Sequence, residues 1–183
     1  MNIEPLFMTP VGVNFLEGID NNALIEFCHK NLDPRNQSSG LDNNKQPLKH
    51  LADEVTKNVN NMHKSLGLKY SQEISYSWCN YGNAFDICRP HVHSHSNSFF
   101  VAVYYLTDSD VKLNFLNPVS QIEKLVKPSL VNEYNCFSQF VQSISPKKGM
   151  LIVHPSWIVH YVDNVKDDRM SIAFDFEVKE DQQ

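Results

Sequence analysis

Three histidines alternate with other residues near the middle of the chain, at His91, His93 and His95, and a fourth, His160, follows much later. Residues two apart point to the same side of an extended chain, so the rings of the early cluster can reach one place. Histidine is the commonest metal ligand. Three ligands on one side of a cation leave positions open for substrate and oxygen, as at non-haem iron. We therefore predict a mononuclear metal site with His93, His95 and His160 as ligands and His91 in reserve.

Arg169 follows His160 by nine residues and opens a segment of alternating character. One face carries Arg169, Ser171, Ala173 and Asp175, and the other carries Met170, Ile172, Phe174 and Phe176. The apolar face is expected to pack against the core. The arginine and the Ser171 hydroxyl can then grip a carboxylate through paired hydrogen bonds. The alternative is an arginine at the rim, paired with Asp167 or Asp168.

The composition indicates a single domain formed by residues 1–183. The chain is long enough to bury a core, and 42% of its residues are hydrophobic. No apolar run approaches the roughly 20 residues that cross a bilayer, so we expect no membrane partner. Residues 1–12 lack the apolar core of a signal peptide.

Charge and cysteine usage narrow the functional class. The net charge of −5 argues against a nucleic-acid or membrane-surface binder, because such proteins carry a basic patch or stripe. Four cysteines, Cys28, Cys79, Cys88 and Cys136, are scattered and form no C-x-x-C pair, which argues against a zinc ribbon. We expect reduced thiols in a cytoplasmic protein.

Residues 1–70 are predicted to be mostly helical and to support the rest of the domain. A short helix is expected over residues 20–32, with Asp20 as its N-cap, and residues 33–46 are expected to form a loop. A second helix is expected over residues 47–66, with Pro47 in its first turn and Gly67 as its C-terminal cap. Its apolar stripe is Leu48, Leu51, Val55, Val59, Met62 and Leu66.

From residue 72 onward the period changes to two, which indicates strands. Ile74, Tyr76, Trp78 and Asn80 should share one face of the first of them. Further strands are expected over residues 98–107, 111–116, 149–154, 157–162 and 171–178. Residues 117–142 are long and irregular, as lids over functional sites often are. We therefore predict a mainly β domain, a jelly roll (double-stranded β-helix, cupin-like) over residues 71–178 with a helical buttress.

Several motifs occur in an order and spacing that identify a family. They are Trp78-Cys79-Asn80, His93-Ser94-His95-Ser96-Asn97-Ser98, Val101-Ala102-Val103-Tyr104-Tyr105-Leu106, Leu113-Asn114-Phe115-Leu116-Asn117-Pro118, Pro155-Ser156-Trp157-Ile158-Val159-His160 and Arg169-Met170-Ser171-Ile172-Ala173-Phe174. Over residues 76–176 the chain resembles the 2-oxoglutarate- and iron(II)-dependent oxygenase superfamily. It is most similar to the branch common in phage and marine bacteria, which carries an H-x-H motif.

The resemblance implies iron(II), 2-oxoglutarate and O2 as cofactor and co-substrates, and hydroxylation of an unidentified primary substrate with release of succinate. It implies that Arg169 binds the distal carboxylate of 2-oxoglutarate, with Ser171 and Tyr104 assisting and Asn80 in contact with co-substrate or substrate. The chain departs from the pattern at Ser96, at Val101-Ala102, at His154 and in having no carboxylate at the middle ligand position. Counting back from the Tyr-Tyr strand selects His93 and His95, whereas an inserted dipeptide would select His91 and His93.

Two other functions are compatible with the same residues. A cupin-like dioxygenase would use three histidines and iron without 2-oxoglutarate, and Arg169 and Ser171 argue against it. A non-catalytic jelly-roll module would use the histidines for structural zinc, with Cys88 as a nearby ligand, or would leave them as a solvated strand end. Structural zinc usually has four ligands, often including cysteine.

Overall fold

The computed structural model describes residues 8–32, 38–82, 89–93, 98–119, 129, 131–135, 138–163, 165 and 168–179. The elements in chain order are β1 (Gly12–Phe15), α1 (Asn21–Asn31), β2 (Ser38–Gly40), α2 (Leu48–Ser65), β3 (Ser71–Tyr81), β4 (Ser98–Tyr105), β5 (Leu113–Leu116), β6 (Val141–Ile144), β7 (Met150–Pro155), β8 (His160–Val162) and β9 (Met170–Lys179).

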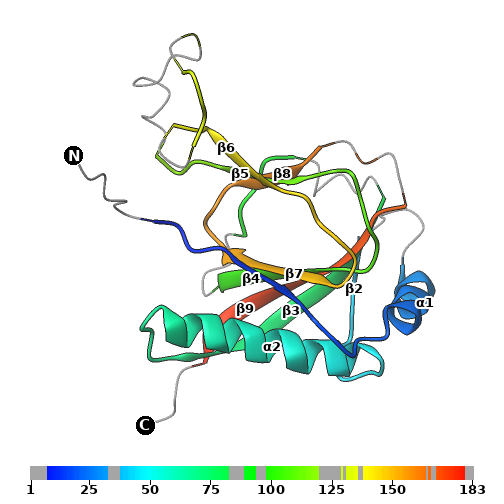
Figure 1. The fold of residues 1–183 in the computed structure, drawn as a ribbon. Helices are drawn as coiled ribbons and strands as arrows, with labels where there is room; N and C mark the ends of the chain where they lie inside the picture. Colours follow the sequence, from blue (N-terminus) through cyan, green and yellow to red (C-terminus); the bar gives the residue numbers. More distant parts are fainter. Residues whose placement is uncertain are drawn as a thin grey trace.

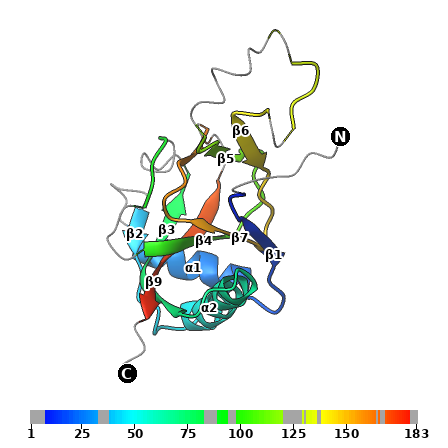
Figure 2. The ribbon, with the colours of Figure 1, turned by 90° about the vertical axis from the view of Figure 1, so that its left-hand side faces the viewer.

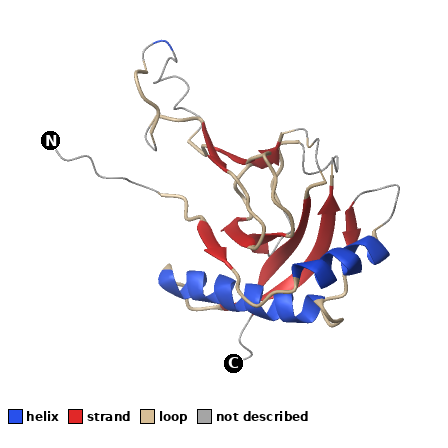
Figure 3. Cartoon of the chain, turned by 45° about the vertical axis from the view of Figure 1, so that its right-hand side comes forward, coloured by secondary structure: helices blue, strands red, loops and turns tan. Residues whose placement is uncertain are grey.

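Two antiparallel sheets form the body of the domain. The large sheet has six strands in the order β1-β7-β4-β9-β3-β2, and the small sheet has three in the order β6-β5-β8. Both helices lie against one face of the large sheet, and the small sheet lies over the other face (Figures 1 and 3). The domain is a double-stranded β-helix, as the alternating segments predict.

The two helices begin and end where the sequence predicts. The Asp20 carboxylate accepts hydrogen bonds from the backbone N–H groups of Asn22 and Ala23 at 3.1 and 3.0 Å, which caps α1. Gly67 has a φ of 74°, the left-handed conformation that commonly ends a helix. The predicted stripe of α2 is buried through Val59, whereas Leu66 is 42% exposed because it lies past the last turn.

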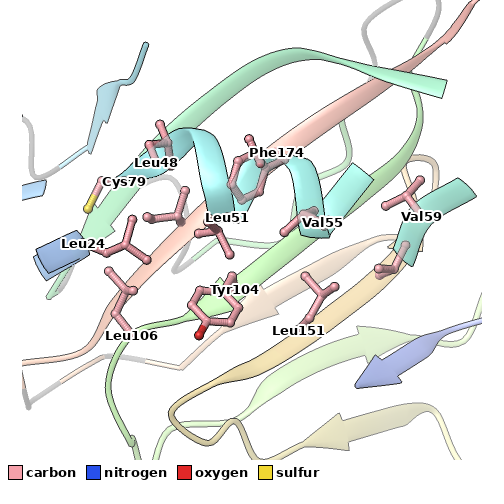
Figure 4. Packing of buried hydrophobic residues seen from close by; sticks show 14 of the residues in the cluster. Leu24, Leu48, Leu51, Val55, Val59, Cys79, Tyr104, Leu106, Leu151 and Phe174 are labelled. Carbon is pink, nitrogen blue, oxygen red and sulfur yellow. The ribbon is translucent and has the colours of Figure 1, made fainter. Parts of the chain in front are cut away.

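The apolar face of β9 packs beneath the helices. Met170, Ile172, Phe174 and Phe176 belong to one buried cluster with the α2 stripe, as Figure 4 shows for Phe174, Leu51 and Val55. This confirms the alternation predicted for the segment after Arg169. The opposite face of β9 is turned toward the space between the two sheets, where a second buried cluster includes Val101, Leu113 and Ala173.

Residues 1–70 contain both helices and also supply two short strands, since β1 pairs with β7 and β2 pairs with β3 at opposite edges of the large sheet (Figure 2). Three local predictions are wrong. Strand β2 lies inside the expected loop, and β6 begins within the expected irregular segment. Ile74 packs against the helix-side cluster rather than beside Trp78, because the register between β3 and β9 shifts between Ile74 and Tyr76.

Residues 120–128, 130, 136 and 137 of the expected lid lie outside the described residues. None of the described helices combines the length and the apolar character needed to cross a bilayer.

Candidate metal and co-substrate site

A backbone bridge brings the first and last histidines together. His91 and His160 pair in antiparallel fashion, and each N–H donates to the other's carbonyl oxygen at 3.0 Å. The bridge extends the small sheet by one residue beyond β8. Side chains of directly opposed residues lie on the same face of a sheet. The two rings are therefore adjacent, with centroids 4.4 Å apart.

His93 completes the cluster from two residues further along the same segment. Its backbone N–H donates to the Ser156 carbonyl at 2.9 Å, which anchors the segment ahead of β8. Its ring lies parallel to that of His160, with 5° between the planes, and the two Nε2 atoms are 3.3 Å apart. One ligand nitrogen from each of His91, His93 and His160 lies within 4.8 Å of the others.

The contacts of the Nδ1 atoms indicate which ring nitrogens are left to face the space between the three rings. His91 Nδ1 lies 2.7 Å from the Arg89 carbonyl oxygen, and His160 Nδ1 lies 3.0 Å from the Ile158 carbonyl oxygen. A carbonyl only accepts, so each Nδ1 carries the proton and each Nε2 keeps its lone pair. His93 Nδ1 lies 2.9 Å from Asp175 Oδ1, within ion-pair distance. The Nε2 lone pairs of His91 and His160 are thus available to a cation, and the His93 Nε2 atom lies beside that of His160.

Burial keeps the inner imidazoles neutral. The pKa of His160 is lowered to about 2, first by burial and then by the neighbouring histidines His154 and His91. Burial also lowers the pKa of His154 to about 4. A neutral imidazole is the form that binds a metal.

Two of the three predicted ligands, His93 and His160, come together, and His91, the alternative ligand, joins them. His95 lies outside the described residues. Three histidines at alternate positions all satisfy an i, i+2 rule, so the pairing of His91 with β8 is the additional information that the sequence lacks.

The histidines open onto a pocket of about 260 Å³ between the two sheets. Its lining is Tyr76, Trp78, Asn80, His91, His93, Val101, Val103, Tyr105, Leu113, His160, Val162, Arg169, Ser171, Ala173 and Asp175. The lining includes the two strand faces predicted from the sequence, namely the polar face of β9 and the face of β3 that carries Trp78.

Arg169 forms the inner wall of this pocket. The side chain is 2% exposed, and its Nε and Nη1 atoms have no hydrogen-bond partner among the described residues;. The Ser171 hydroxyl, also buried, likewise has none among them. The guanidinium carbon lies 5.2 Å from the centre of the Tyr105 ring. A buried cation with unused donors is a site for an anion, and a guanidinium fits a carboxylate with two hydrogen bonds.

Tyr104 is misassigned by the sequence. Its side chain lies in the helix-side cluster (Figure 4), and its hydroxyl donates to Asn21 Oδ1 at 2.9 Å. The pocket is lined instead by Tyr105, whose pKa is raised by burial, an effect that Arg169 partly offsets. Counting alternate residues from Val101 and Val103, both pocket residues, reaches Tyr105 and would have identified it. Asn80 lies in the lining as predicted, and its role stays a prediction.

Fold and site together describe a double-stranded β-helix with a cluster of three histidines and a buried arginine lining one pocket. A family model described as "Putative 2OG-Fe(II) oxygenase" matches residues 76–175, more than half of the chain. The chain belongs to this family. It is a non-haem iron(II) oxygenase that uses 2-oxoglutarate and O2, rather than a cupin-like enzyme independent of 2-oxoglutarate. A sequence comparison with curated proteins gives no match.

Solved structures of oxygenases share the fold. A prolyl-4-hydroxylase of Pseudomonas putida superposes with a TM-score of 0.66 at 15% identity, over 93% of this chain and 94% of that one. A viral collagen prolyl hydroxylase from Paramecium bursaria Chlorella virus-1 gives 0.60 at 12% identity, over 98% and 99%. HygX from Streptomyces hygroscopicus, with nickel and 2-oxoglutarate bound, gives 0.54 at 9% identity, over 92% and 82%.

Proposed function

We propose that His91, His93 and His160 hold the iron(II) of this oxygenase and that Arg169 and Ser171 hold the distal carboxylate of 2-oxoglutarate. The observation that carries the proposal is the convergence of one ring nitrogen from each of these three histidines, each of which also has its Nδ1 atom within 3.0 Å of a carbonyl or carboxylate oxygen. The buried guanidinium with unused donors supports the second half.

The histidine cluster fits a metal ion in both chemistry and spacing. Imidazole suits iron, and a three-ligand set leaves positions for co-substrate and oxygen. Two imidazole nitrogens bound at about 2.1 Å to neighbouring positions of one cation lie roughly 3 Å apart. The 3.3 Å between the Nε2 atoms of His93 and His160 agrees with that spacing.

The residues around the cluster would position and shield the reaction. When bound, the iron with 2-oxoglutarate and O2 supplies the oxidising power to hydroxylate a C–H bond, yielding succinate and CO2. Arg169 fixes the far end of the co-substrate, so that its keto-acid end is directed at the histidines. Val101, Val103 and Leu113 form an apolar wall that excludes water and strengthens these polar contacts.

The primary substrate would approach past an aromatic rim on β3. The Tyr76 and Trp78 rings stack with centroids 5.6 Å apart, and Trp78 stacks in turn on His93 at 5.5 Å. Tyr76 is 52% exposed, so the stack leads from the surface to a ligand. A Cβ atom on Gly40 of β2 would come within 2.7 Å of the Tyr76 hydroxyl oxygen, so the ring occupies the space that a side chain there would need.

The decisive experiment measures iron and 2-oxoglutarate binding under anaerobic conditions. Wild-type protein should bind one Fe(II) and then 2-oxoglutarate, and on exposure to oxygen should release succinate slowly even without primary substrate. His160→Ala should lose both metal binding and succinate release. Equal iron affinity in wild type and His160→Ala would show that the three histidines are not the iron ligands.

We infer further that the enzyme works in the reducing cytoplasm. The support is that Cys28 and Cys79, both buried, are free thiols, the state expected where disulfides are rare.

A further inference from the structure

The proposed ligand set leaves a charge to be balanced. Three neutral imidazoles do nothing to offset the two positive charges of iron(II), and Arg169 adds another beside it. The co-substrate brings two negative charges. Among the described lining residues, Asp175 is the one carboxylate. An Asp175 carboxylate would bring the net charge of the loaded pocket to zero, which lowers the cost of burying these charges.

Asp175 reaches the metal centre through one ligand. Its Oδ1 atom lies 2.9 Å from His93 Nδ1, and the two side chains are 3% and 10% exposed. On the large sheet Asp175 is paired with Val101 of β4 on one side and Tyr76 of β3 on the other, which fixes it below the His93 ring. The Nδ1 atoms of His91 and His160 meet backbone carbonyls instead.

We propose that Asp175 is a positioning residue: its carboxylate acts on the metal through His93 and so compensates for the carboxylate that is absent from the ligand set. It orients the His93 ring, and by drawing on the Nδ1 proton it places negative charge on the imidazole and strengthens the Nε2 bond to the metal. A carboxylate behind a ligating histidine typically changes metal affinity or activity by about 10- to 100-fold. This inference rests on the proposed assignment of His93 as a ligand.

Asp175→Asn tests the charge with little change of shape. Titration of metal-free protein with Fe(II) or Co(II), without 2-oxoglutarate, should show affinity lowered by about 10- to 100-fold, and the Co(II) absorption spectrum should shift. Asp163→Asn is the matched control, because it removes the same charge from an exposed carboxylate three residues after His160. Its affinity should stay within about twofold, as expected for a surface charge. Circular dichroism of both metal-free variants checks the fold.

Wild-type protein offers a test that needs no variant. In the Zn(II)-loaded form, the proton resonance on His93 Nδ1 should lie further downfield than those of His91 and His160, since a carboxylate shares a proton more strongly than a carbonyl does. Three equivalent resonances, or unchanged metal affinity in folded Asp175→Asn, would overturn the role of Asp175. If that happens while His160→Ala still loses the metal, the histidine centre stands. If wild type itself binds no metal, the proposed function fails first.

Discussion

Tyr104 and Tyr105 are neighbours in the chain and face opposite sides of the large sheet. Tyr104 points to the helices and donates to Asn21, whereas Tyr105 lines the pocket beside Arg169. The Tyr104 hydroxyl therefore contributes to the stability of the helix side, whereas the Tyr105 hydroxyl contributes to the pocket.

Removing each hydroxyl should separate these effects. Tyr104→Phe loses one buried hydrogen bond and should lower the free energy of unfolding by about 1 kcal/mol, with KM for 2-oxoglutarate unchanged. Tyr105→Phe should alter that KM and leave the stability nearly as it is. Urea unfolding and succinate release measure the two quantities. A raised KM in Tyr104→Phe alone would contradict the placement of the two side chains.

Alanine substitution of His91 and of His95 should show which of the two binds the metal together with His93 and His160. His91→Ala removes a nitrogen that faces the other two rings and should weaken Fe(II) binding at least about tenfold. His95→Ala serves as the comparison, and we expect Fe(II) affinity near that of wild type. Anaerobic titration with Fe(II) distinguishes the two variants, and the opposite order would restore the His93 and His95 pair.

Loss of the Arg169 guanidinium should affect the co-substrate and spare the metal. Truncating one partner of a buried charged pair costs about 2 kcal/mol or more, so Arg169→Ala should raise KM for 2-oxoglutarate at least about 30-fold. Ser171→Ala should have a smaller effect of the same sign, because it removes a single neutral donor. Unchanged KM in Arg169→Ala with intact iron binding would exclude this wall as the carboxylate site.

Acid should destabilise the metal-free protein through its buried histidines. The pKa of His154 is about 4 in the folded state and 6.5 when unperturbed. The unfolded chain therefore binds the proton first, and the free energy of unfolding should fall as pH drops from 6.5 toward 4, with no such loss above 6.5. One such histidine accounts for up to about 3 kcal/mol. Urea unfolding of wild type and His154→Leu in chelator should show a shallower pH slope in the variant.

The sequence predicts the faces of the long strands well, because burial imposes a period of two. Arg169, which directly precedes β9, and Ser171 could be assigned from the sequence alone to one side of this segment, and the packed phenylalanines to the other. Ile74 escapes the same rule because a single register shift reverses the side on which it lies. The short strand β2 has only three residues, and its pairing with β3 is a tertiary effect.

The sequence was enough to predict a cation site, from the spacing of the early histidines and the distant His160, but not to single out the proposed ligand set. The proposal of His91 as a ligand depends on its backbone pairing with His160. The proposed role of Asp175 depends on the distance between its Oδ1 atom and His93 Nδ1. Neither relationship leaves a local pattern in the sequence.

The absence of a side chain at Gly40 leaves room for the Tyr76 ring at the proposed entrance for the primary substrate. An added methyl group at position 40 would lie 2.7 Å from the phenol oxygen, so the ring would have to move. A substitution at this one position of an edge strand would therefore reshape the proposed entrance and leave the residues of the proposed iron and 2-oxoglutarate sites in place.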